Sequence, residues 1–125
     1  MIVGIGTDII EIARIRDAIQ KYGERFTNRI FTQSEQTYCE SKVTSYQHYA
    51  VRFAGKEAAF KALGTGLIGK MNWTDLEFVQ DELRRPLLIC EGEFAKRYQD
   101  LNVNRTHVSF SHTNSHAIAV IIFEK

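Results

Sequence analysis

The feature that most constrains the fold is a run of helix-forming residues, RFAGKEAAFKALGTG, at positions 52–66. Its alanines have high helix propensity and little bulk, so the predicted helix can lie close to a neighbouring element. Gly64 follows the last helical residue and suits a left-handed C-cap. The stretch therefore predicts a long helix that ends at Gly64 and packs closely.

One face of this helix carries Glu57 and Lys61, four residues apart, and leads to a turn formed by Gly64, Thr65 and Gly66. A carboxylate binds hard cations, a lysine neutralises phosphate, and a glycine-rich turn presents backbone N–H groups to anions. The alternative interpretation of this spacing is an ordinary surface ion pair between Glu57 and Lys61.

Composition predicts a globular protein with a single domain over residues 1–125. Hydrophobic residues make up 44% of the chain and charged residues 25%, and no linker-like segment is present. Cys39 and Cys90 form no C-x-x-C pattern, so we expect free thiols. There is no signal-peptide pattern and no apolar run long enough to cross a bilayer, so we expect a cytoplasmic protein without a membrane partner.

The net charge is only +1, which argues against nucleic acid as a partner, but the charge is unevenly distributed. Between residues 14 and 29, five basic side chains outnumber two acidic ones. Arg14, Arg25 and Arg29 belong to this basic stretch. It predicts either a surface that attracts an acidic partner or a solvated helix face.

The first half of the chain reads as one strand followed by helices. Residues 1–6 predict a buried strand, with Asp8 just beyond it, and a helix follows that ends at Gly23. Residues 25–30 predict a short helical turn. Thr32 and Glu35 have capping-box spacing, as do Thr44 and Gln47, so a helix should begin at each place.

The second half is richer in strands. Strands are predicted at 76–80 and 86–90, joined by a turn, and again at 106–112 and 117–123, with a helix at 92–101 between the pairs. The last strand is apolar throughout, so we expect it to be central and covered on both faces. Early helices and late strands indicate an α+β fold with an antiparallel sheet.

Asp8 and Glu57 lie on different predicted elements, as the carboxylates of a Mg²⁺ site usually do. Asp8 is equally suited to be the N-cap of the following helix. Glu11 is either a further ligand through water or a first-turn acid favoured by the helix dipole. His107 suits a phosphate contact or an ordinary strand position, and the four histidines match no structural zinc pattern.

Together, these segments resemble a known family. GIGTDIIEIARI at 4–15 and RFAGKEAAFKALGTG at 52–66 closely resemble the two signatures of holo-acyl-carrier-protein synthase, the small bacterial type of 4′-phosphopantetheinyl transferase. The segments 76–86 and 107–113 are also similar to that family. The resemblance covers nearly the whole chain, and both main motifs are long and specific.

The resemblance implies roles for most of the candidate residues. Asp8 and Glu57 match the residues that hold Mg²⁺, and Lys61 matches a lysine near the phosphates of coenzyme A; these three would be the catalytic residues. The positions that would line the coenzyme A site are Gly64, Thr65, Gly66, Pro86 and His107.

The resemblance also implies partners and an assembly. Arg14 matches an arginine that contacts acyl carrier protein, and Arg25 and Arg29 would assist it. Proteins of this family are homotrimers with sites at the subunit interfaces. Their fold is a long helix packed on a small antiparallel sheet.

The implied reaction is Mg²⁺-dependent transfer of 4′-phosphopantetheine from coenzyme A to a serine of apo-acyl carrier protein, releasing adenosine 3′,5′-bisphosphate, in fatty acid biosynthesis. Two alternatives are a non-enzymatic trimeric module that binds a nucleotide, and a transferase acting on carrier domains of peptide or polyketide synthases. Two residues depart from the family pattern: Phe60 replaces a small residue, and Arg84 replaces a glycine before the basic residue and Pro86.

Overall fold

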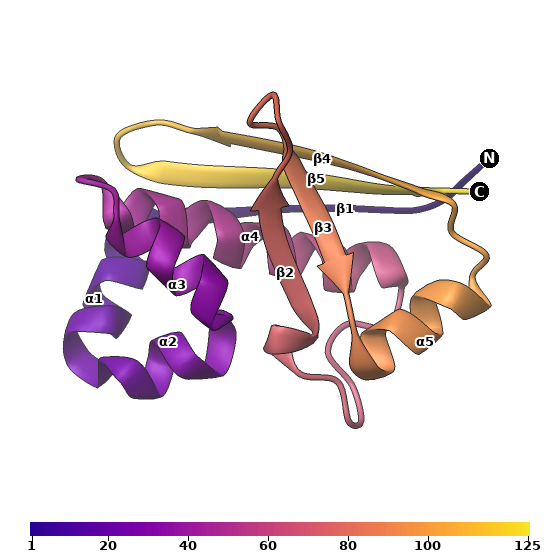
Figure 1. The fold of residues 1–125 in the computed structure, drawn as a ribbon, viewed down its shortest axis with the longest axis horizontal. Helices are drawn as coiled ribbons and strands as arrows, with labels where there is room; N and C mark the ends of the chain where they lie inside the picture. Colours follow the sequence, from indigo (N-terminus) through magenta and orange to yellow (C-terminus); the bar gives the residue numbers. More distant parts are fainter.

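A computed structural model describes all 125 residues as a mixed α+β fold, as the sequence predicted (Figure 1). The strands are β1 Ile2–Glu11, β2 Leu76–Gln80, β3 Pro86–Cys90, β4 Arg105–His112 and β5 His116–Glu124. The helices are α1 Ile12–Tyr22, α2 Glu24–Ile30, α3 Gln33–Glu40, α4 Ser45–Leu63 and α5 Gly92–Asp100, with a 3₁₀ turn η1 at Trp73–Asp75. No helix is both long enough and apolar enough to span a bilayer.

The long helix α4 lies between two antiparallel sheets. One sheet has three strands in the order β1-β5-β4, and the other is the β2–β3 hairpin. Helix α4 packs along one face of the three-stranded sheet. The hairpin crosses α4 near the middle of the helix, and α1–α3 lie at the N-terminal end of α4 (Figure 1). Buried residues occur on all sides of α4, as expected of a helix enclosed by its neighbours.

Strand β5 is central, as predicted, but only one of its faces is covered within the chain. Its burial alternates: Ala119 and Ile121 are fully buried, whereas Ile118 is 36% exposed. The uncovered face continues onto β1, where Ile5 and Ile9 are more than 60% exposed. We call this apolar surface the open sheet face; it includes Ile5, Thr7, Ile9, His107, Ser109, Ile118, Val120 and Ile122.

Strand β1 is longer than predicted, because it pairs with β5 as far as Glu11. Asp8 therefore lies inside the strand, opposite Ala119, and not at the start of α1. The interpretation of Asp8 as an N-cap was wrong: α1 begins at Ile12, and its N-cap position is taken by Glu11, which makes no side-chain cap bond.

Two glycines bring β1 against α4 with no space between their backbones. A Cβ atom added at Gly4 would lie 2.0 Å from the Ala62 carbonyl oxygen, and one at Gly6 would lie 1.8 Å from that of Ala58. Larger side chains on either element would hold them apart, so glycine on the strand and alanine on the helix set the spacing. This contact places Asp8 beside the surface of α4.

The predicted starts of α3 and α4 and the predicted end of α4 were right, since α3 begins at Gln33 and α4 runs from Ser45 to Leu63. Thr32 and Glu35 form the expected capping box, and Gly64 is a left-handed C-cap with φ 87°. Thr44 makes no side-chain cap bond at the start of α4, so the second predicted capping box was wrong. Its ψ of 51° departs from the extended conformation that an N-cap residue usually adopts.

We predict that Gly6→Ala destabilises the fold by more than about 2 kcal/mol, because β1 and α4 must separate to admit the methyl group. The free energy of unfolding from urea denaturation, followed by circular dichroism, measures the loss. Thr7→Ala, which changes the opposite face of the same strand, is the control and should cost less than about 1 kcal/mol. Equal stability of Gly6→Ala and the wild type would show that the two backbones are not in contact.

Candidate functional site

The contact between β1 and α4 brings together the three predicted catalytic side chains. The Lys61 Nζ donates to the Asp8 carboxylate at 3.1 Å and to the Thr7 carbonyl oxygen at 3.0 Å. Lys61 makes no ion pair with Glu57, so the interpretation of these two residues as a simple surface pair was wrong. The lysine instead joins the helix to the strand.

Glu57 lies close enough to Asp8 for their charges to interact. Burial is the main reason that the pKa of Glu57 is raised, and repulsion from Asp8 raises it further, while Lys61 opposes the shift. The structure has no cluster of three or more metal-ligating side chains, and Glu11 remains exposed. Two adjacent carboxylates fit a hard cation that takes its remaining ligands from water and phosphate, as Mg²⁺ does.

The turn after α4 is adjacent to this carboxylate site but has few free donors. The Gly64 N–H donates to the Lys61 carbonyl oxygen at 3.0 Å, and the Gly66 N–H donates to that of Phe60 at 3.2 Å. Both bonds close the C-terminal end of the helix. Of the three predicted turn residues, only Thr65 retains an N–H with no partner in the chain, so the Lys61 ammonium is the strongest group here that could bind a phosphate.

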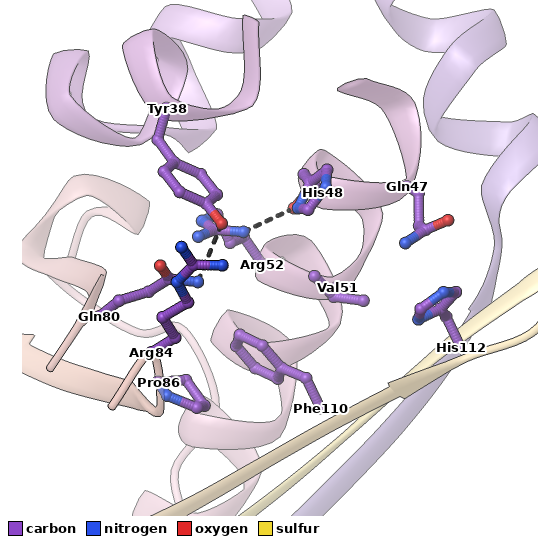
Figure 2. Close-up of a pocket in the computed structure, with 10 residues that line it drawn as sticks. All are labelled: Tyr38, Gln47, His48, Val51, Arg52, Gln80, Arg84, Pro86, Phe110 and His112. Atoms are coloured by element: carbon purple, nitrogen blue, oxygen red, sulfur yellow. Dashed lines mark hydrogen bonds between the residues drawn. The ribbon is translucent and has the colours of Figure 1, made fainter. Parts of the chain in front are cut away.

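A second candidate site is a pocket between α3, the N-terminal half of α4, the hairpin and β4, which we call the basic pocket (Figure 2). Pro86 is the only predicted site residue in it. The residues lining the pocket are Tyr38, Gln47, His48, Val51, Arg52, Gln80, Arg84, Pro86, Phe110 and His112. Its charged groups are cationic, so the pocket is suited to an anion.

Arg52 is the best-anchored cation of the basic pocket. It is only 4% exposed, its guanidinium stacks 4.4 Å above the Tyr38 ring, and its Nη1 donates to the His48 carbonyl oxygen at 3.2 Å. Its Nε atom is buried without a partner. Burial and then the charge of Arg52 lower the pKa of His48. Sequence reasoning assigned no role to Arg52, although its four-residue spacing from His48 was visible.

The two departures from the family pattern have structural explanations. Arg84 adopts φ 63°, so it preserves the left-handed conformation that a glycine would supply in the hairpin turn. The Asp81 carboxylate accepts bonds from the Leu83 and Arg85 N–H groups, which brace this turn. Phe60 is 2% exposed and packs against Trp73 and Phe94, so it belongs to the core.

His107 lies away from Asp8 and Glu57. It points to the open sheet face, where its ring lies 3.1 Å from the Glu124 carboxylate, whereas Asp8 faces α4 on the other side of the same sheet. The basic pocket is a third surface, because none of its lining residues belongs to the carboxylate site or to the open sheet face. The residues predicted for catalysis and coenzyme A binding therefore lie on three surfaces of one chain.

The predicted partner-binding arginines are exposed on neighbouring helices. Arg14 lies on α1, and Arg25 and Arg29 lie on α2, where they line a shallow depression with Tyr22 and Phe26. None of the three arginines forms an ion pair within the chain. This surface thus offers unpaired positive charge beside aromatic side chains.

Comparison with known proteins identifies the family. The sequence profile of the 4′-phosphopantetheinyl transferase superfamily matches residues 4–121. The holo-[acyl-carrier-protein] synthase of Koribacter versatilis is 44% identical over 124 residues, with 99% of each chain covered. That of Chlamydia muridarum is 47% identical over 121 residues, covering 97% of this chain and 94% of its own.

Solved structures agree with the sequence comparison. The synthase of Neisseria meningitidis has a TM-score of 0.91 at 32% identity, with each chain fully covered. The Bacillus anthracis synthase, in complex with CoA (3′,5′-ADP), has a TM-score of 0.80 at 34% identity and coverage of 98% and 96%. The Helicobacter pylori synthase, in complex with coenzyme A, has a TM-score of 0.84 at 29% identity and coverage of 96% and 99%. The resemblance seen in the sequence is thereby confirmed, and the chain belongs to the 4′-phosphopantetheinyl transferase superfamily as an enzyme of its holo-[acyl-carrier-protein] synthase group.

Proposed function

We propose that residues 1–125 act as one cytoplasmic transferase domain that moves 4′-phosphopantetheine from coenzyme A to a serine of apo-acyl carrier protein. The reaction depends on Mg²⁺, releases adenosine 3′,5′-bisphosphate and serves fatty acid biosynthesis. The observation that carries this proposal is the meeting of Asp8, Glu57 and Lys61, which joins two cation-binding carboxylates to a phosphate-binding ammonium. A module that only binds a nucleotide would bind coenzyme A without transferring the phosphopantetheine arm.

The side chains at the carboxylate site would have different roles in the transfer. Asp8 and Glu57 would hold Mg²⁺, which when bound neutralises charge on the diphosphate. The side chain of Lys61 is 54% exposed, so its ammonium is free to turn from Asp8 toward a phosphate oxygen. The serine oxygen forms the new bond to phosphorus in line with the departing bisphosphate oxygen.

Glu57 is the group we assign to accept the proton of the attacking serine hydroxyl. Its carboxylate would lie beside the bound diphosphate, where the serine hydroxyl attacks.

The basic pocket would hold the nucleotide part of coenzyme A. Arg52 and Arg84 supply positive charge for a phosphate, with His48 and His112 beside them. Pro86 supplies an apolar wall against which an adenine ring can pack (Figure 2). Coenzyme A has both a diphosphate and a nucleotide phosphate, so it is a ligand with groups for both cationic sites.

We further propose a homotrimer with active sites at the subunit interfaces. The open sheet face exposes Ile5, Ile9 and Ile118 on paired strands, and a contiguous exposed apolar patch of this kind often marks an interaction site. In the proposed trimer, His107 and Pro86 of one subunit would lie near Asp8 and Glu57 of the next. A head-to-tail interface repeated around a threefold axis closes into such a ring.

The exposed arginines would receive the acidic acyl carrier protein. Arg14, Arg25 and Arg29 have no partner within the chain, so their charge is available to attract an acidic helix. Attraction of this kind raises the association rate and orients the partner toward the carboxylate site.

We predict that Glu57→Gln lowers transfer at least about a hundredfold, because both a metal ligand and the proton acceptor are lost. The assay incubates the protein with apo-acyl carrier protein, coenzyme A and Mg²⁺, and mass spectrometry detects the phosphopantetheine arm. Asp17→Asn, which changes an exposed acid on α1, is the control. Near-normal transfer by the Glu57 variant would refute its proposed role.

The same variant should raise the melting temperature at pH 8 without metal. The folded-state pKa of Glu57 lies above its ordinary value of 4.5, so its ionisation opposes folding. This cost is absent below the unfolded-state pKa and grows as the pH rises through the folded-state value. Glutamine removes the cost, so the stability gain should disappear at pH 4, and thermal unfolding at both pH values tests this.

The interface proposal predicts complementation between two inactive variants. Asp8→Asn and His107→Ala should each be inactive alone, because each variant lacks one contributor to every site. Co-expression should restore about one quarter of all sites in a random mixture, because one site in each mixed trimer pairs an intact Asp8 with an intact His107. Light scattering reports the mass of the assembly, and an inactive mixture or a monomeric wild type would contradict the proposal.

Arg14→Glu should raise the KM for acyl carrier protein about tenfold at low salt, because it reverses charge on the docking surface. Its dissociation constant for coenzyme A, measured by calorimetry, should stay within about twofold of the wild-type value. Lys96→Glu on α5 is the matched charge reversal outside this surface. A selective loss of coenzyme A affinity in the Arg14 variant would mean that the surface is misassigned.

A further inference from the structure

Glu35 and Lys56 form a fully buried ion pair outside the groups assigned to the transfer reaction. Both side chains are 0% exposed, and the Lys56 Nζ lies 2.7 Å from the Glu35 Oε1. The same ammonium donates to the Ile30 carbonyl oxygen at 2.7 Å. Removing two charges from water costs free energy, which excellent geometry and additional hydrogen bonds can offset.

The Glu35 carboxylate connects three elements of the fold. Its Oε1 accepts from the backbone N–H of Thr32, at the start of α3, and from Lys56 in the middle of α4. Its Oε2 accepts from the backbone N–H of Phe78 in β2 at 2.9 Å. One buried side chain thus ties the hairpin to the helix that carries Glu57.

Few other hydrogen bonds join the hairpin to the rest of the chain. Its two strands pair only with each other and not with the three-stranded sheet, and an isolated hairpin is marginally stable. The Thr32 hydroxyl donates to the Glu77 carboxylate at 2.6 Å, beside the bond from Glu35 to Phe78. The Phe78 ring packs against α4 where Gly55 lacks a side chain.

The far end of the hairpin forms one wall of the basic pocket. Arg84 and Pro86 lie there, and Arg52 and His48 on α4 lie across the pocket from them (Figure 2). A shift of β2 relative to α4 therefore changes the distance between the two walls.

We propose that Glu35 is a positioning residue for coenzyme A, holding the β2–β3 hairpin at the distance from α4 that lets both walls of the basic pocket contact the nucleotide. The proposal rests on the proposed function of that pocket. Glu35 does not touch the ligand itself, and it acts through Phe78 and the hairpin backbone.

Glu35→Gln tests the hydrogen bonds that join the hairpin to α4, with almost no change of side-chain volume. The amide has one acceptor oxygen in place of two, while Thr32, Lys56 and Phe78 all still present donors. At least one donor must then face the amide NH₂ group, and Lys56 loses its counter-charge. This variant is expected to be less stable, so a second variant is needed.

The double variant Glu35→Leu with Lys56→Met separates stability from positioning. It removes the ion pair as a unit, so no unpaired charge remains in the core, and replacing such a pair by apolar side chains is often tolerated. The Phe78 N–H still loses its acceptor. Glu40→Gln is the control, because the Glu40 carboxylate accepts a bond from Tyr49 at 2.7 Å and does not reach the hairpin.

Calorimetry gives the dissociation constant for coenzyme A, transfer assays give kcat and both KM values, and hydrogen exchange follows the hairpin amides. We expect both Glu35 variants to weaken coenzyme A binding and raise its KM about tenfold, the effect of losing one hydrogen bond to a charged group. The KM for acyl carrier protein and kcat should change less than about threefold. In both Glu35 variants, the hairpin amides should exchange faster than in the wild type, while the β5 amides should exchange at the wild-type rate. The Glu40 control should match the wild type throughout.

Wild-type affinity for coenzyme A in a folded Glu35 variant would overturn the proposal. A parallel loss of kcat and of affinity for both substrates would also overturn it, because that result means general destabilisation. If the wild type binds coenzyme A but transfers nothing, the proposed function fails, while affinity and exchange still test Glu35. If the wild type binds no coenzyme A, both proposals fail.

Discussion

The contact between β1 and α4 is the constraint on which the rest of the structure depends. Gly4 and Gly6 have no side chains, so the backbone of β1 lies directly against Ala58 and Ala62 of α4. The next inward-facing residue of the strand is Asp8, which the contact places within reach of Lys61. The packing that closes the core therefore also assembles the charged site.

That assembly opposes the stability of the isolated chain. Two carboxylates in a half-buried place repel each other, and burial raises the pKa of Glu57 further. Lys61 relieves part of the repulsion by pairing with Asp8. Under the proposed function, a bound cation would relieve this repulsion, so activity and stability would make opposite demands on Glu57.

Local signals in the sequence predicted most of the fold. The Thr32 capping box, the Gly64 cap and the strand beginning at Pro86 depend on neighbours within a few residues, and all three are present. The failures depend on distant partners or on backbone angles. Pairing with β5 extends β1 through Asp8, and the conformation of Thr44 prevents its predicted cap. The basic pocket was largely missed, because Arg52 meets Arg84 and His112 only after the chain has folded.

The sequence by itself determined the family, the α+β class and the identity of the chemical groups, because long motifs preserve both spacing and residue type. Only the tertiary structure decided that Asp8 and Lys61 meet, that Glu35 joins three elements, and that one face of the sheet remains open. It also placed His107 on the side of the sheet opposite Asp8. These outcomes depend on strand register and on the approach of backbones far apart in the chain, which no local pattern encodes.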